Sequence, residues 1–93
     1  MKAHSRFVAN FAAARRAIGL TQQKAAERMR CRLHGGWNTR SVENFERGHR
    51  EVTITEAECL AAIVCVPLDR MFTGSASHVI EIAASNMRTG APR

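Results

Sequence analysis

The stretch from Thr21 to Gly48 constrains the fold of this chain more than any other part of the sequence. It reads TQQKAAERMRCRLHGGWNTRSVENFERG, and its apolar residues recur at the three- and four-residue spacing of amphipathic helices. Gly35 lies between two such segments and can end the first of them. The pattern predicts two short helices joined by a turn.

The second of these helices, predicted over residues 38–47, has two different faces. Val42 and Phe45 are three residues apart and lie on one side. A polar stripe at positions i, i+3, i+4 and i+7 lies on another side: Arg40, Glu43, Asn44 and Arg47. Any surface helix needs a polar face, but arginine, asparagine and glutamate are also the side chains that read base edges. We therefore predict base contacts from Asn38, Thr39, Arg40, Glu43 and Asn44.

Three spaced motifs resemble those of a known family. They are GLTQQ at residues 19–23, AAERM at residues 25–29 and SVENFERG at residues 41–48. Together they resemble the phage Cro/repressor helix-turn-helix family over most of the chain, and this implies an all-α domain of five helices that binds DNA. The turn departs from the family pattern of about four residues, because a longer segment separates Met29 from Trp37. This elongated variant looks like many actinobacterial members.

A second group of residues is predicted to hold DNA phosphates. Thr21 can cap the helix that follows it, where free backbone amides and the positive end of the helix dipole attract an anion. The resemblance implies a further phosphate contact from the loop after Gly48. For the first-turn glutamines, an ordinary polar surface role is the alternative. The predicted phosphate contacts are Thr21, Gln22, Gln23, Arg30, Arg32, Arg47, His49 and Arg50.

Periodicity offers an explanation for the long turn. Leu33 follows Met29 at i+4, which predicts that the first helix continues to His34 and stops at Gly35. Trp37, just before the predicted cap Asn38, is expected to pack on Val42 and set the direction of the second helix. Stacking of Trp37 on a base is the alternative.

The first helix of the chain is predicted to begin at a Ser5 cap after a frayed arm and to end at Gly19. Its apolar stripe is Phe7, Phe11, Ala14 and Ile18. Arg15 lies beside this stripe, and a half-buried arginine needs a carboxylate partner. In the resembling family an arginine at this position pairs with a glutamate that is Glu46 here. A solvent-directed Arg15 is the alternative.

Two more helices are predicted before residue 75. Thr53 and Glu56 form a capping box. The apolar side of the helix that they open is Ile54, Ala57, Leu60, Ala61 and Val64. A short helix over residues 68–72 follows Pro67 and stops at Gly74.

The tail is harder to interpret. We divide the chain into a DNA-binding domain at 1–74 and a tail at 75–93. Residues 77–84 fit a short strand or a helix, with the strand preferred, and residues 87–93 are expected to be disordered. Val79, Ile80 and Ile82 have no evident partner in the first domain, so we predict that this segment joins two chains. Folding back onto its own domain is the alternative.

Composition limits the class of function. The chain has 93 residues and a net charge of +6, which suits a single domain with an acidic partner. No apolar run could span a membrane and no secretory signal is recognisable, so a cytoplasmic location is expected. Cys59 and Cys65 are expected to be buried free thiols. Cys31 and His34 are too few to favour a metal site, and no cofactor or small-molecule ligand is expected.

No arrangement of residues typical of catalysis is recognisable, so we do not expect an enzyme. The sequence favours a sequence-specific regulator of transcription, Cro-like or repressor-like, that binds inverted repeats of double-stranded DNA as a homodimer. The alternative is an antitoxin-type module that neutralises a partner protein and binds DNA secondarily. Co-purification of such a partner would distinguish the two.

Overall fold

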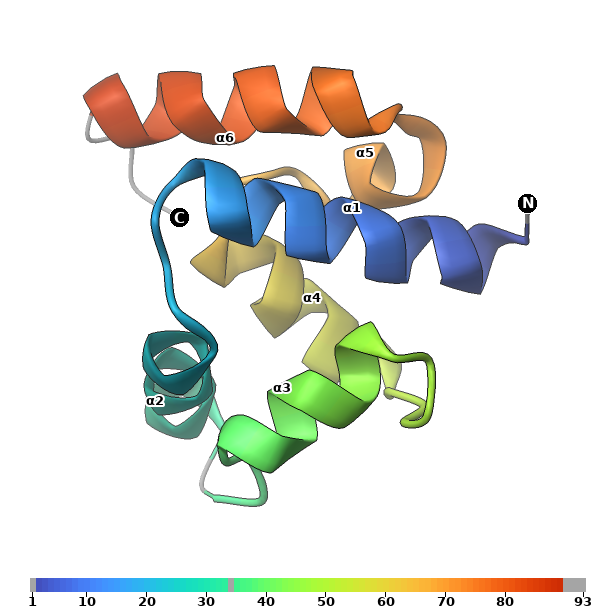
Figure 1. Ribbon diagram of the computed structural model, residues 1–93, viewed down its shortest axis with the longest axis vertical. Coiled ribbons are helices and arrows are strands. Elements are labelled where there is room, and N and C mark those ends of the chain that lie inside the picture. The colour runs from blue at the N-terminus through green and yellow to red at the C-terminus, as the bar shows by residue number, and fades with distance from the viewer. Residues whose placement is uncertain (1, 34, 90–93) are drawn as a thin grey trace.

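The computed structural model describes residues 2–33 and 35–89 of the chain. Within these ranges the secondary structure is entirely helical, with no strand (Figure 1). The helices are α1 (Ala3–Ala17), α2 (Gln22–Arg32), α3 (Thr39–Glu46), α4 (Ile54–Ile63), α5 (Leu68–Thr73) and α6 (Ala76–Thr89). The predicted all-α class is confirmed, with one helix more than the five that were expected.

Helix α1 contacts three other helices, α3, α5 and α6, because its apolar stripe is buried in the centre of the core. Phe7 and Phe11 of this stripe both meet Phe45 of α3 edge to face, with ring centroids 5.9 and 5.5 Å apart. The helix begins at Ala3, so the predicted Ser5 cap is wrong. The ring of His4 lies 6.3 Å from that of Phe45, and this contact holds the first turn of α1 against α3.

The connection from α2 to α3 differs from the prediction. Helix α2 ends at Arg32, two residues before the expected His34, which itself lies outside the described residues. Leu33 has extended backbone with φ −128° and ψ 109°, yet its side chain is partly buried against the core. The four-residue spacing from Met29 thus identified a packing residue and not a further helical turn. Gly35 has φ 99°, in the left-handed region that glycine adopts without strain.

The capping box at the start of α4 is confirmed. The Glu56 backbone N–H donates to Thr53 Oγ1 at 3.1 Å, and the Thr53 N–H donates to Glu56 Oε1 at 2.8 Å. Ile54 is 72% exposed, so its placement on the apolar side was wrong: it is the first residue of the helix and lies before the turn that meets the core. The rest of that predicted side is buried: Ala57, Leu60, Ala61 and Val64.

The end of α4 has a residue in an unusual conformation. Cys65 has φ 65°, the left-handed conformation that usually takes a glycine after a helix. Its N–H donates to the Ala62 carbonyl oxygen at 3.1 Å. Cys59 and Cys65 are free thiols, but both are half-buried rather than buried as predicted. Helix α5 then ends at Gly74, as expected.

The segment predicted as a strand is the helix α6, which lies along α1 (Figure 1). Val79 and Ala83 are four residues apart and fully buried, and Ile82 packs partly against the same core. The expectation that this segment had no partner in the chain was therefore wrong. Residues 87–89, expected to be disordered, belong to α6, and residues 90–93 lie outside the described ranges.

A buried amide ties α1 to the connection between α5 and α6. Asn10 is 2% exposed, and its Nδ2 donates to the carbonyl oxygens of Met71 and Gly74, each at 2.9 Å. A Cβ on Gly74 would lie 2.8 Å from the Arg70 carbonyl oxygen and 3.2 Å from Val79 Cγ1, so only glycine fits. Asn10 could not be identified from the sequence, because nothing in its own helix marks it as a contact.

Candidate nucleic-acid interface

Helix α3 is held by one face and exposes the other. Val42 and Phe45 are fully buried, as their spacing predicted. The predicted polar stripe is outside the core, exposed at Arg40 and Arg47 and half-exposed at Glu43 and Asn44. Thr39, the first residue of the helix, is also half-exposed. A rigid helix thus presents two guanidinium groups, an amide and a carboxylate along one side.

The start of α3 is fixed by a reciprocal cap. Asn38 Oδ1 accepts a hydrogen bond from the Ser41 N–H at 2.9 Å, while the Asn38 N–H donates to Ser41 Oγ at 3.1 Å. The cap predicted from sequence is confirmed. Because the cap uses its side-chain oxygen, Asn38 is a weaker candidate for base contact than Arg40 or Asn44.

Trp37 is a structural residue at the entrance to α3. It is 2% exposed and belongs to the same core as Val42, so the alternative of base stacking was wrong. Its Nε1 donates to Glu56 Oε2 at 3.1 Å. The guanidinium of Arg50 stacks over the indole, 4.3 Å from the ring centroid, and its Nη2 lies 3.4 Å from the same carboxylate oxygen.

These three side chains join the α2–α3 turn to the loop after α3. Partial burial raises the pKa of Glu56, but hydrogen bonds from Thr53, Trp37 and Arg50, with the charge of Arg50, outweigh it and lower the pKa overall. Glu56 therefore stays ionised between its partners. Arg50, predicted to contact phosphate, is engaged inside the protein. From the sequence, only a capping role was predicted for Glu56, since no local pattern links it to Trp37.

The predicted ion pair between Arg15 and Glu46 is confirmed. Arg15 Nε donates to Glu46 Oε2 at 2.6 Å and Nη2 donates to Oε1 at 3.1 Å, while Nη1 reaches the Leu20 carbonyl oxygen at 2.9 Å. Gln22 Nε2 also donates to Glu46 Oε1, at 3.0 Å. One carboxylate on α3 thereby fixes α1 and the first turn of α2.

The cap predicted at the start of α2 is confirmed, since Thr21 Oγ1 accepts a hydrogen bond from the Lys24 N–H at 3.1 Å. Gln22 is tied to Glu46, whereas Gln23 and Lys24 are exposed. Lys24 was not selected from the sequence, although it adds a positive charge to this turn. Its ion pair with Glu27, at 3.5 Å, is on the surface.

The two arginines of the long turn do not lie together. Arg30 Nη1 donates to the Trp37 carbonyl oxygen at 2.9 Å and so closes the turn. Arg32 lines a hollow between α2 and the end of α4. His49, in contrast, is exposed in the loop that follows Gly48, where its backbone N–H donates to the Asn44 carbonyl oxygen at 2.8 Å.

Comparisons with protein-family models, characterised proteins and solved structures found no match to this chain. In the described ranges, no helix combines the length and apolar character needed to cross a bilayer. Nor do residues 2–33 and 35–89 contain a cluster of three or more histidine, cysteine, aspartate or glutamate residues able to hold a metal ion. His34, weighed with Cys31 as a ligand, lies outside those ranges.

Proposed function

We propose that this chain is a sequence-specific DNA-binding regulator of transcription of the Cro/repressor helix-turn-helix type, Cro-like or repressor-like, acting in the cytoplasm. In this proposal α2 and α3 are the two helices of the motif, and α3 enters the major groove. The observation that carries it is the stripe on α3, which exposes base-reading side chains while Val42 and Phe45 fix the opposite face.

The residues of the stripe have distinct roles in the proposal. Arg40 and Asn44 read bases, since arginine can hydrogen-bond guanine twice and asparagine can do the same with adenine. Glu43 accepts from cytosine, and Thr39 and Asn38 supply shorter contacts. Phosphates are held by Arg47 at the end of the stripe, by His49 in the loop after it, and by the positive end of α2 at Thr21, Gln22 and Gln23.

We infer that two copies bind together. Helix α3 has 8 residues and is about 12 Å long, so it covers only a few base pairs. Two copies on inverted half-sites about one helical turn apart would provide enough contacts for specific binding. Neither a cofactor nor an enzymatic activity forms part of this function.

The test begins with selection of bound sequences from a pool of random duplex DNA. Replacement of Arg40 or Asn44 by alanine should then weaken binding to the selected site by about 1–3 kcal/mol and leave binding to random DNA nearly unchanged. Arg70→Ala is the matched control, because Arg70 is exposed on α5, away from α3. Selection that yields no preferred sequence, or equal losses on both DNAs, would contradict the proposal.

A further inference from the structure

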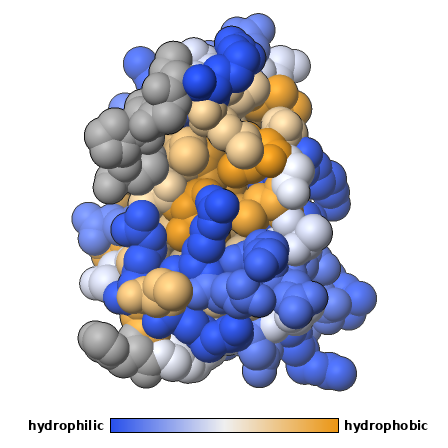
Figure 2. Space-filling model, turned by 90° about the vertical axis from the view of Figure 1, so that its left-hand side faces the viewer, coloured by the Kyte–Doolittle hydropathy of each residue, from blue (hydrophilic) through white to orange (hydrophobic). Residues whose placement is uncertain are grey.

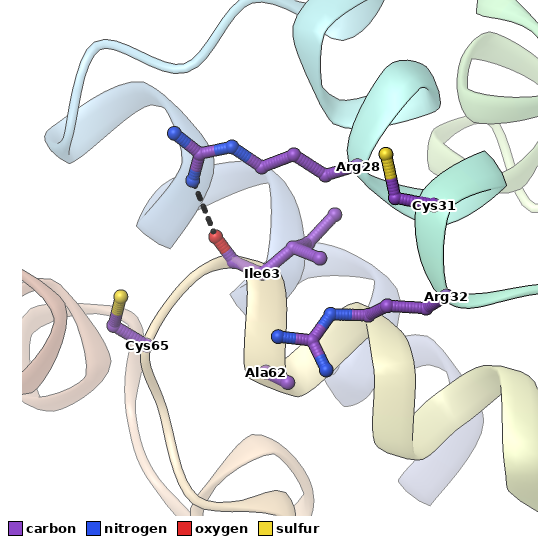
Figure 3. Close-up of a pocket in the computed structure, with 6 residues that line it drawn as sticks. All are labelled: Arg28, Cys31, Arg32, Ala62, Ile63 and Cys65. Carbon is purple, nitrogen blue, oxygen red and sulfur yellow. Dashed lines mark hydrogen bonds between the residues drawn. The ribbon is translucent and has the colours of Figure 1, made fainter. Parts of the chain in front are cut away.

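A second surface of the molecule is apolar at its centre. Figure 2 shows the side that carries the end of α1, the C-terminal parts of α4 and α6, and α2 below them, with apolar atoms gathered between hydrophilic ones. One hollow on this side has a volume of about 410 Å³ (Figure 3). It is lined by Arg28, Cys31, Arg32, Ala62, Ile63 and Cys65.

A second hollow lies between α1 and α6, with a volume of about 400 Å³. It is lined by Ala17, Ile18, Ala84, Met87 and Arg88. Met87 is 53% exposed and so offers an apolar side chain at the edge of this hollow. A hydrogen bond from Asn86 Nδ2 to the Cys65 carbonyl oxygen, at 2.8 Å, joins the helix that lines the second hollow to the turn that lines the first.

The charged groups of these two linings are all of one sign. Three arginines line the hollows and no acidic residue does. Arg28 Nη1 donates to the Ile63 carbonyl oxygen at 3.3 Å, and Arg32 lies on the other side of Ile63 (Figure 3). Within the described ranges, the guanidinium groups of Arg32 and Arg88 have neither a hydrogen bond nor an ion pair, and both residues are exposed. Two cations that have no partner among the residues the structure describes thus border an apolar surface.

We propose that this surface, formed by the two hollows and their arginines, docks an acidic amphipathic segment of a partner protein. Apolar side chains of the segment occupy the hollows, and its carboxylates pair with Arg32 and Arg88. A second copy of this chain fits poorly, since a two-fold contact places this positively charged surface against an identical one with no acidic residue in its lining. The apolar centre distinguishes the surface from a site for nucleic acid, whose contacts are mostly with phosphate.

This surface is distinct from the groups that the proposed function places on DNA, since Arg28, Cys31 and Arg32 lie on α2 but beyond its phosphate-binding first turn. None of the residues that line the hollows belongs to α3 or to the loop that follows it. The partner can therefore be bound while α3 is in contact with DNA. Arg32, predicted from the sequence to contact phosphate, instead pairs with a carboxylate of the partner in this arrangement.

The experiment uses the isotope-labelled full chain and a synthetic helical peptide with leucines at i, i+3, i+4 and i+7 and glutamates beside them. Saturable shifts of backbone amide resonances are expected at the residues that line the hollows and not on α3. Arg88→Glu and Met87→Glu should each raise the dissociation constant of the peptide at least about threefold. The double variant Arg32→Glu, Arg88→Glu should raise it about tenfold or more. Arg70→Glu, an exposed charge reversal on α5, is the matched control and should change nothing.

Two control peptides, a test for dimers and a test with lipid vesicles distinguish this proposal from its alternatives. A peptide with glutamine in place of each glutamate should bind more weakly, and one with lysine should not bind. Equal binding of all three peptides, or shifts confined to α3, would overturn the proposal. Two other results would also overturn it. Sedimentation of a dimer that Met87→Glu dissociates would assign the surface to a second copy of the chain. Binding to phosphatidylglycerol vesicles that is tighter than binding to the peptide, and that Arg88→Glu abolishes, would assign the surface to a membrane.

Discussion

Arg15 and Glu46 form a bidentate ion pair across the interface of α1 and α3, with N–O distances of 2.6 and 3.1 Å and side chains only 10% and 7% exposed. Water can do little to stabilise either charge at this depth, so each charge depends on the other. Gln22 donates a third hydrogen bond to the same carboxylate. The pair therefore fixes the start of α2 relative to α3, and in the proposed function it positions the phosphate-binding turn beside the reading helix.

Removal of one partner of this pair should be strongly destabilising. Arg15→Ala or Glu46→Ala leaves a buried charge without its partner and should lower the free energy of unfolding by about 3–5 kcal/mol. The double variant should lose less than the sum of the two, as measured by urea unfolding. Glu27→Ala, which removes the exposed pair with Lys24, serves as control and should cost less than about 0.5 kcal/mol. Additive losses would mean that the two charges do not interact.

The dependence of DNA binding on salt should separate Arg47 from Arg32. Arg47 is exposed at the end of α3, whereas Arg32 lines the hollow beside α4. Arg47→Gln should reduce the slope of log K against log salt concentration by about one unit, because one phosphate contact is lost. Arg32→Gln should leave the slope unchanged. A similar reduction in both variants would place Arg32 on the DNA backbone after all.

Glu56 should make stability depend on pH in acid. Its pKa is lowered in the folded protein, so its charge contributes stability that is fully present above the pKa of an unfolded glutamate, about 4.3, and is lost as the pH falls through the lower folded value. Glu56→Gln keeps one oxygen, which can accept from the Thr53 N–H, but its amide nitrogen cannot accept from Trp37 Nε1 and it has no charge for Arg50. The stability difference between the two proteins should shrink as the pH falls from about 6 to about 3.

The fluorescence of Trp37, the one tryptophan of the chain, can follow this unfolding. Glu58→Gln provides the control, since Glu58 is exposed on the same helix. A stability difference that stays constant over this pH range would show that the ionisation of Glu56 is not linked to folding.

Two neighbouring residues of α6 test its packing on α1. Val79 is fully buried, whereas Ile80 is 38% exposed. Val79→Ala should destabilise the protein by about 2 kcal/mol because it leaves a cavity, and Ile80→Ala should cost less than about 0.5 kcal/mol. Urea unfolding measures both. If the larger loss falls on Ile80, the buried face of α6 has been assigned to the wrong residues.

Features that depend on a few neighbouring residues could be predicted from the sequence. The caps of α2, α3 and α4 follow from Thr21, Asn38 and Thr53, because each needs only the residue three positions later. The two faces of α3 follow from the helical period. The Arg15 pair was predicted because a buried guanidinium must find a carboxylate, and the family resemblance indicated which one.

Features set by distant parts of the chain could not be predicted in this way. The alternation of apolar residues in the tail fits a strand as well as a helix, and what favours the helix is the surface of α1, at the other end of the described chain. Arg50 was assigned to phosphate from the family resemblance of its loop, and nothing local indicates its stacking on Trp37 or its contact with Glu56. The end of α4 carries Cys65 in place of the glycine that usually signals such a turn.

During synthesis, α1 leaves the ribosome long before α6 exists. The face of α1 that Val79 and Ala83 cover is therefore open in the nascent chain. The Nδ2 of Asn10 has no carbonyl acceptor before Met71 is made, and it has both only after Gly74 is made. Pairing of α1 with α3 through Arg15 and Glu46 can come first. The placement of α3 would then be established early in translation, and the final step of folding would be the closure of α6 over α1.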